Sequence, residues 1–256
     1  MVNFFIKNIA CLFFLLLLSQ GGYSKCVSFD TLNYDEIKFS KINYFNLQGN
    51  NESLEQEISQ MNDNYYKDYI LGYSYLIGKN KLKNYTLAEQ YLTKSALYCF
   101  SPAHYSLGYL YYIENNFEEA RKWFLSAKEL GDNLAAHQLA IIYKKENNSE
   151  KMLENLYFSE SHGFTPSITE LGVTYYDGIF VKKDSKKAFE YFERAALKND
   201  PLAQNNLGWM YEHGEGTEIN IEKAEYWYRI ASENGFELAT KNLNKLNNTS
   251  ENKISF

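Results

Sequence analysis

The stretch LGWMYEHGEGTEINIEKAEYWYRIASENGFELA, residues 207–239, contains two apolar, helix-like segments joined by a glycine-rich turn. Its first ten residues place a histidine and two glutamates among three glycines. Taken alone, such a cluster would suit a phosphate loop, a metal loop or a plain turn. The choice depends on whether the pattern occurs once or recurs along the chain.

Two ladders of residues recur in step through most of the sequence. The first consists of leucines separated by 36, 32, 32, 36 and 36 residues: Leu71, Leu107, Leu139, Leu171, Leu207 and Leu243. The second consists of small or apolar residues separated by 32, 32, 36 and 36 residues: Ala88, Ala120, Met152, Ala188 and Ala224. Two ladders in step predict a two-helix unit that is stacked about five times.

Each unit divides into a helix A, a loop and a helix B. In one unit, PSITELGVTYYDG at 166–178 is helix A and DSKKAFEYFERAALKN at 184–199 is helix B. In helix A, alanine often stands four residues before the ladder leucine and tyrosine four after it, which predicts one buried ridge. The small residue after the leucine lets the partner helix approach. Proline opens three A helices, where its missing N–H costs nothing: Pro102, Pro166 and Pro201.

The recurrence answers the question of the glycine-rich turn. Gly78, Gly178 and Gly214 occupy the same place in three units, yet the residues that follow them differ in chemistry. His213 and Glu215 occur in one copy only. These glycines therefore indicate a turn between helices with positive φ, and not a phosphate or metal site.

The stretch at 207–239 resembles the Sel-one-like repeat, a relative of the tetratricopeptide repeat. It contains Leu-Gly-x-x-Tyr-x-x-Gly-x-Gly, then Lys-Ala, aromatic residues, Ala and Gly235, which Asn199 replaces one unit earlier. The units at 107–138 and 139–170 lack the glycine loop and look closer to tetratricopeptide units. The resemblance covers roughly residues 65–246. It implies an all-α, right-handed α-solenoid of about five helix-turn-helix repeats.

The N-terminus has a different composition. One early charge, Lys7, precedes an apolar run over 9–18 that is too short for a membrane span of roughly 20 residues. Small residues follow, as in a secretory signal peptide, so we predict that residues 1–24 are cleaved after Ser24. A lipid anchor at Cys26 and an uncleaved anchor are the alternatives. We expect an exported bacterial protein, periplasmic or secreted, with the endoplasmic-reticulum lumen as the alternative.

The remaining chain divides into three parts. Residues 25–62 are predicted to form an N-terminal helical cap, 63–247 the repeat solenoid, and 248–256 a disordered tail. Export would leave Cys26 and Cys99, which either form one disulfide or stay as two thiols.

No catalytic pattern occurs in the sequence, so we predict no catalytic, cofactor-binding or metal-binding residues and no enzyme activity. None of the four histidines lies at zinc spacing from another histidine or a cysteine. The net charge of −6 argues against nucleic acid as a partner, because nucleic acid favours a basic surface. We expect a monomer without stable membrane insertion after signal cleavage.

Aromatic residues recur on the side of helix A opposite the buried ridge, where a surface should be polar. In related solenoids helix A lines the concave surface, so these rings would form an aromatic binding wall. The alternative, for the first two units, is that neighbouring A helices pack these rings together. The predicted partner-binding residues are Tyr69, Tyr73, Tyr105, Tyr109, Tyr112, His137, Tyr176 and Trp209, with Trp209 as the strongest candidate.

These observations predict an exported protein–protein interaction module that binds a protein or peptide on the concave face. The family resemblance implies two specific forms: a bacterial envelope adaptor, or an immunity protein against a secreted effector. The alternative is a small-molecule-binding or hydrolytic protein similar to the cysteine-rich, β-lactam-binding branch of the family. That branch has cysteine pairs within its repeats, and this chain has no such pattern.

Overall fold

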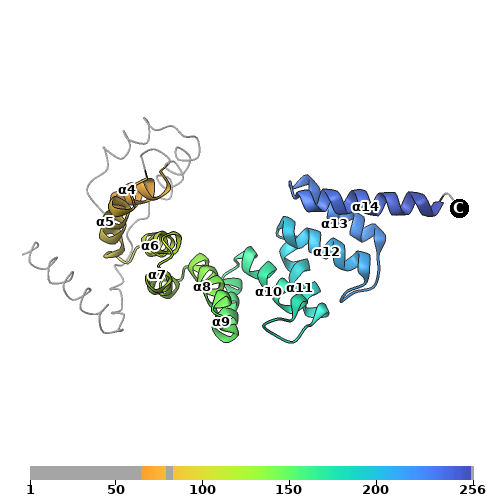
Figure 1. The fold of residues 1–256 in the computed structure, drawn as a ribbon, viewed down its shortest axis with the longest axis horizontal. Helices are drawn as coiled ribbons and strands as arrows, with labels where there is room; N and C mark the ends of the chain where they lie inside the picture. Colours follow the sequence, from red (N-terminus) through yellow and green to blue (C-terminus); the bar gives the residue numbers. More distant parts are fainter. Residues whose placement is uncertain (1–64, 79–82, 255–256) are drawn as a thin grey trace, which may run out of the picture. The chain divides into compact units, whose positions relative to one another are not determined.

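The helices of this protein come in pairs joined by short turns, with the alternation that the two ladders predict (Figure 1). The computed structural model describes residues 65–78 and 83–254, and side chains as far as residue 248. The A helices are α4 (Tyr65–Ile77), α6 (Ser101–Ile113), α8 (Asn133–Lys145), α10 (Thr165–Asp177), α12 (Pro201–His213) and α14 (Glu237–Ile254). The B helices are α5 (Tyr85–Ala96), α7 (Phe117–Glu129), α9 (Ser149–Ser161), α11 (Ser185–Ala196) and α13 (Ile221–Glu233).

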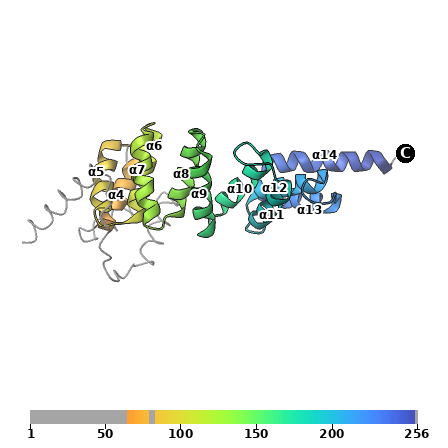
Figure 2. The same ribbon diagram turned by 90° about the horizontal axis from the view of Figure 1, so that it is seen from below.

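The chain divides within α8 into two compact units, the first of which ends at Ala135 and the second of which begins at Ala136. In both units the helices of a pair pack together, as α6–α7 and α12–α13 do (Figure 1, Figure 2). Each unit also packs B helices on the next A helix, as α5 does on α6 and α11 on α12. This nearest-neighbour stacking confirms the predicted all-α solenoid of five helix-turn-helix repeats, to which α14 adds a last A helix.

One residue in every turn from helix A to helix B makes two hydrogen bonds. Its side-chain oxygen accepts from the backbone N–H three residues on and so caps the B helix. Its own N–H donates, over 2.8–3.1 Å, to the carbonyl of the tyrosine four residues after the ladder leucine. Asn84, Asn116, Asn148, Asp184 and Asn220 are these capping residues.

The helix ends use the left-handed backbone conformation that the turn glycines predict. Gly178 and Gly214 cap α10 and α12 with φ of 68° and 71°. In the shorter turns that follow α6 and α8, an asparagine adopts this conformation, as Asn115 does with φ of 61°. Asn199, after α11, occupies the place that Gly235 has after α13. Its φ is 62°, so asparagine adopts the left-handed conformation there in place of glycine.

Most ladder residues lie in the core, as expected, while Leu71 and Leu243 at the two ends are half-buried. Leu107, Leu139, Leu171 and Leu207 are fully buried. The glycine after the leucine brings the two helices of a pair together: a Cβ on Gly108 would lie 2.6 Å from Cδ1 of Phe124. On Gly208 it would lie 2.8 Å from Cδ1 of Tyr228. Real Cβ atoms do not approach other atoms so closely, so these positions require glycine in the present packing.

A buried polar contact joins neighbouring repeats in each unit. Nε2 of His104 in α6 lies 3.0 Å from the carbonyl oxygen of Ala96, at the end of the preceding B helix. In the other unit Nε2 of Gln204 donates to the equivalent carbonyl, of Ala196, over 3.2 Å. Both side chains stand three residues before a ladder leucine. Each carbonyl also accepts from a backbone N–H of the following turn, that of Cys99 or Asn199, so the side chain adds a second hydrogen bond at the helix end.

Helix α14 differs from the expectation of a disordered tail at 248–256, because it continues to Ile254. Neither glycine nor proline follows residue 235, so nothing in the sequence breaks the helix. Asn244 and Asn247 are exposed at the places that Gly208 and Tyr211 occupy in α12. Polar residues thus cover the side of α14 on which a B helix would pack, as the end of a repeat stack requires.

Several predictions fall outside the described residues: the signal peptide at 1–24, the cap over 25–62, and the state of Cys26. Cys99 is disulfide-bonded, while its predicted pairing with Cys26 stays a prediction. None of the helices within 65–254 is both long and apolar enough to cross a membrane.

Candidate functional site

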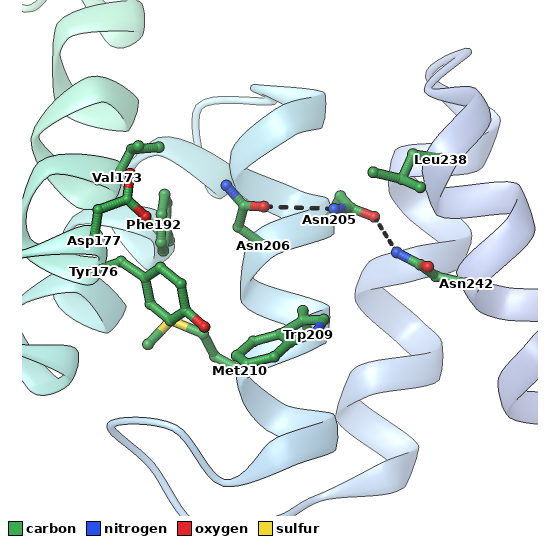
Figure 3. A pocket seen from close by; sticks show the side chains of 10 residues that line it. All are labelled: Val173, Tyr176, Asp177, Phe192, Asn205, Asn206, Trp209, Met210, Leu238 and Asn242. Atoms are coloured by element: carbon green, nitrogen blue, oxygen red, sulfur yellow. Dashed lines mark hydrogen bonds between the residues drawn. The ribbon is translucent and has the colours of Figure 1, made fainter.

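A pocket of about 410 Å³ lies among the A helices of the C-terminal unit (Figure 3). Three successive A helices, α10, α12 and α14, supply nine of its ten lining residues, and α11 supplies the other. The pocket is therefore a hollow on the A-helix side of this unit. Its lining residues are Val173, Tyr176, Asp177, Phe192, Asn205, Asn206, Trp209, Met210, Leu238 and Asn242.

Two aromatic rings meet at one side of the pocket (Figure 3). The rings of Tyr176 and Trp209 are 5.5 Å apart, edge to face, with an interplanar angle of 82°. Trp209 also stacks on His213 with ring centroids 4.1 Å apart, which fixes the indole in place. Met210 and Phe192 are buried and give the pocket an apolar base, while the Leu238 side chain on α14 stays 50% exposed. Apolar surface is thus available to a bound molecule.

Three asparagines form the polar side of the pocket (Figure 3). Nδ2 of Asn242 donates to Oδ1 of Asn205 over 2.9 Å and joins α14 to α12. Nδ2 of Asn205 in turn donates to Oδ1 of Asn206 over a long 3.5 Å. Asn205 is 4% exposed, so its side chain makes its contacts inside the protein. Asn206 and Asn242 are half-buried. Nδ2 of Asn206 and Oδ1 of Asn242 have no partner within the described residues.

Acidic groups dominate the charge near the tyrosine. Asp177 is the last residue of α10 and is exposed at the pocket. Burial raises the pKa of Tyr176, and the negative charges of Glu215 and Asp177 raise it further. One cation lies close, since Nζ of Lys183 is 4.9 Å from the centroid of the Tyr176 ring.

The predicted binding residues have different surroundings within each unit. In the C-terminal unit, Tyr176 and Trp209 come together with Val173 and Asn205, which share their side of helix A. His137 in α8 instead packs within the protein: its Nδ1 lies 2.8 Å from Oγ of Ser167. Burial lowers the pKa of this histidine, although the charge of Glu170 opposes the shift.

In the N-terminal unit most of the predicted wall packs on neighbouring rings. Tyr69 stacks on Tyr73 at 5.8 Å and meets Phe100 edge to face at 5.1 Å. The Tyr105 ring lies 5.6 Å from that of Phe124, and the Tyr112 ring lies 5.5 Å from that of Phe117. By contrast, Tyr109 is 41% exposed. These rings thus pack on a ring of the same helix, of the following B helix, or of Phe100 before α6, while Tyr109 is exposed.

Sequence reasoning missed eight residues of the pocket, because only Tyr176 and Trp209 are among the predicted binding residues. The repeat contains a signal for two of them, because Asn206 and Asn242 both directly precede ladder leucines. Asp177 was placed inside helix A at 166–178 and was given no role in binding. The eight residues are Val173, Asp177, Phe192, Asn205, Asn206, Met210, Leu238 and Asn242.

The pocket offers little for catalysis. Its ionisable groups are a carboxyl, of Asp177, and a phenol, of Tyr176, and its lining contains no serine, cysteine, histidine or lysine. Nowhere in the described part of the chain do three or more His, Cys, Asp or Glu residues gather as a metal site would require. The arrangement is suited to binding through aromatic, amide and carboxylate groups.

Comparison with known proteins identifies the repeat. The Sel1 repeat model matches residues 69–97, 101–132, 165–200 and 201–236. The second of these ranges covers α6 and α7, so this pair matches the family model despite lacking the glycine loop. The interpretation of that unit as closer to a tetratricopeptide repeat was therefore wrong. The α8–α9 pair lies between the matched ranges.

Two solved structures have a similar fold. A Sel1 repeat protein from Oxalobacter formigenes is 27% identical, with a TM-score of 0.71 over 81% of this chain and 89% of that one. The second is c5321, described as a protective antigen of uropathogenic Escherichia coli strains that displays an SLR fold. It is 28% identical, with a TM-score of 0.66 over 78% of this chain and 44% of that one.

Curated relatives share only part of their length with this chain. The chitin synthase regulator SKT5 of Saccharomyces cerevisiae is 31% identical over 150 residues, which are 56% of this chain and 21% of the relative. HRD3 of Candida glabrata, an ERAD-associated E3 ubiquitin-protein ligase component, is 29% identical over 133 residues, or 49% and 16%. The chain thus spans about a fifth or less of the length of these relatives.

Proposed function

Because the chain belongs to the Sel1 repeat family, whose repeats generally mediate protein interactions, we propose that it binds a segment of a partner protein in the pocket between α10, α12 and α14. The observation that carries this proposal is the combination of Trp209 and Tyr176 with Nδ2 of Asn206 and Oδ1 of Asn242, two atoms without a partner within the described residues. Tryptophan and tyrosine contribute most to binding at protein interfaces when they lie in such hollows.

The chemistry of the lining favours a polypeptide over a small substrate. A peptide bond offers one N–H and one carbonyl, which match the free oxygen of Asn242 and the free nitrogen of Asn206. The hydrolytic alternative gains no support, because the lining lacks a nucleophile with a neighbouring base. The cysteine-rich branch also gains none, since Cys99 is the one cysteine of the described residues.

We further propose that the protein acts after export, as a bacterial envelope adaptor or as an immunity protein against a secreted effector. The support is the apolar N-terminal stretch at 9–18 and the disulfide-bonded state of Cys99, which suits an oxidising compartment. Fractionation of cells that produce the full chain tests this location. Recovery of the protein in the cytosol with a reduced Cys99 would contradict it.

A photo-crosslinking experiment tests the binding site. A benzoylphenylalanine replaces Leu238, which is 50% exposed at the pocket, and in a second protein replaces Tyr226, which is 56% exposed on α13. Each protein is irradiated in cells of the source, and the crosslinked partner is identified by mass spectrometry. We expect one partner to crosslink from position 238 and not from position 226.

The crosslinked partner is then purified and titrated directly. Trp209→Ala should abolish binding, while Trp227→Ala should leave it unchanged, because Trp227 lies on the B helix α13. Circular dichroism checks that both variants fold. Equal binding by the folded Trp209→Ala protein would refute the pocket as the interface.

A further inference from the structure

We propose that the pocket receives an arginine or lysine side chain of the partner segment. Asp177 would pair with its charge, and the rings of Tyr176 and Trp209 would pack against its stem and head. This inference rests on the proposed function, because it specifies which segment the same pocket selects. Three features of the described residues support it.

The first feature is the position of Asp177. A carboxylate in the last turn of a helix faces the negative end of the helix dipole, so it destabilises the helix. Asp177 ends α10, is exposed, and has no hydrogen-bond or ion-pair partner among the described residues. A residue that opposes its local structure without compensation indicates a function. A cation would offset the negative charge at this position, because both the carboxylate and the C-terminal end of the helix would attract it.

The second feature is the aromatic pair. Rings of tyrosine and tryptophan attract ammonium and guanidinium groups within about 6 Å of their centroids. The protein already places one such group here, since Nζ of Lys183 is 4.9 Å from the Tyr176 centroid. Lys183 belongs to the turn and does not line the pocket. A partner's basic side chain would therefore compete with Lys183 for the ring or use the Trp209 indole beside it.

The third feature is the balance of charge around Tyr176. Glu215 and Asp177 both act on its phenol and raise its pKa, in addition to burial. Oε2 of Glu215 accepts a hydrogen bond of 2.8 Å from Oγ of Ser185, which holds this carboxylate in place. Two carboxylates thus act on the same ring over which one ammonium, of Lys183, lies. The negative potential disfavours an acidic segment and attracts a basic one.

A peptide selection tests the inference. A display library of random dodecapeptides is selected on the folded protein, and the same library is selected on Asp177→Lys. We expect arginine or lysine to be enriched at one position on the wild type and aspartate or glutamate to be enriched at that position on Asp177→Lys. The best wild-type peptide is then synthesised with blocked ends and titrated by calorimetry.

Two variants should change the affinity in opposite directions. Asp177→Asn removes the pairing charge and should weaken binding roughly tenfold. Lys183→Met removes a competing cation and should strengthen binding about threefold. Glu193→Gln, on the outer helix α11, changes the charge equally outside the pocket and should have no effect. A peptide with norleucine in place of the basic residue should bind the wild type more weakly than the selected peptide does. This norleucine peptide should bind the wild type and Asp177→Asn equally well.

The outcomes separate the inference from the proposed function. Peptides enriched without a basic residue, or bound equally by Asp177→Asn, would overturn the inference and leave segment binding intact. Failure to enrich any peptide would overturn both. N-acetylarginine methylamide is titrated as well: binding as tight as that of the peptide would show that the pocket holds a free cation and not a protein segment, which also overturns the inference.

Discussion

His104 in α6 and Gln204 in α12 occupy equivalent positions in two repeats. Nε2 of His104 lies 3.0 Å from the carbonyl of Ala96, and its Nδ1 lies 2.8 Å from Oγ of Ser126. The carbonyl can only accept, so Nε2 carries a proton and donates to it; when the ring is neutral, Nδ1 accepts from the Ser126 hydroxyl. Burial lowers the pKa of His104 from 6.5 to about 4, although the bond to Ala96 opposes the shift.

We predict that His104→Gln makes the protein less sensitive to acid. A histidine whose pKa is lowered by folding binds protons more readily when unfolded, so its stabilising contribution is complete above pH 6.5 and is lost toward pH 4. Between pH 7 and pH 5 the wild type should lose about 2 kcal/mol of unfolding free energy through this residue. Glutamine can make the same contact without titrating, as Gln204 does.

Urea unfolding at pH 7 and pH 5 measures the difference. His162→Gln serves as the control, because His162 is exposed on the protein surface and should leave the loss unchanged. An equal loss of stability in wild type and His104→Gln would show that His104 does not govern the acid response.

Gly108 tests how closely the helices of a pair must approach. We predict that Gly108→Ala destabilises the protein by ~1–3 kcal/mol, because its Cβ would lie 2.6 Å from Cδ1 of Phe124. This exceeds the gain of up to about 1 kcal/mol that alanine brings to a helix. Adding Phe124→Leu should relieve the overlap, since another pair combines Ala140 with Leu156 at these positions. Chemical denaturation of both single mutants and the double mutant measures the coupling, and additive effects would contradict it.

Among the helices, a lysine near the start of helix B contacts the tyrosine of helix A in three pairs. Lys151, Lys187 and Lys223 place Nζ 4.0–5.3 Å from the ring centroids of Tyr143, Tyr175 and Tyr211. In the α10–α11 pair the lysine also donates to the phenol oxygen of Tyr175 over 2.7 Å. The hydroxyl of Tyr157 on α9 lies 2.5 Å from the same oxygen and joins the neighbouring repeat.

We predict that Lys187→Met raises the pKa of Tyr175 and destabilises the pair by about 0.5–1 kcal/mol. Burial alone would raise this pKa, but hydrogen bonds from Lys187 and Tyr157 together with the lysine charge leave it below its ordinary value. Tyrosine-ring ¹³C NMR across the alkaline range, assigned with Tyr175→Phe, follows the pKa. Lys223→Met, in the next pair, should leave the Tyr175 pKa unchanged. A Tyr175 pKa that stays low in Lys187→Met would refute the contact.

The helix pairs could be predicted because the buried positions recur at the spacing of the two ladders. The four middle ladder leucines are fully buried at equivalent places in successive A helices, so their spacing predicts the fold. The pocket depends on residues that the ladder does not constrain, such as Leu238 on α14 and Asp177 at a helix end. The aromatic side of helix A was ambiguous for a related reason: rings there either face outward, as Tyr109 does, or pack on a neighbour, as Tyr69 does on Phe100.

For the chain as a whole, nearest-neighbour stacking means that a site depends on its own repeats and on those next to it. The pocket lies within α10–α14 of the C-terminal unit. Contacts hold α8 and α9 to this region: Nζ of Lys144 donates to Glu170 over 2.5 Å, and Arg194 pairs with Glu160. The α8–α9 pair therefore supports the near side of α10 without lining the pocket.

We predict that residues 132–256 alone fold and bind the selected peptide as tightly as the full chain. This fragment keeps Asp132, whose Oδ1 accepts from the N–H of Ala135 at the start of α8 over 2.8 Å. Residues 164–256 keep every pocket residue but lose Tyr157, Lys144 and Glu160, and they expose the buried Ile168 of α10. This shorter fragment should unfold at a lower urea concentration, because α10 then lacks its neighbour. Circular dichroism and calorimetry compare the three proteins. Loss of binding by a folded 132–256 fragment would show that the site needs the N-terminal repeats, whereas equal stability of both fragments would show that α8 and α9 contribute nothing to it.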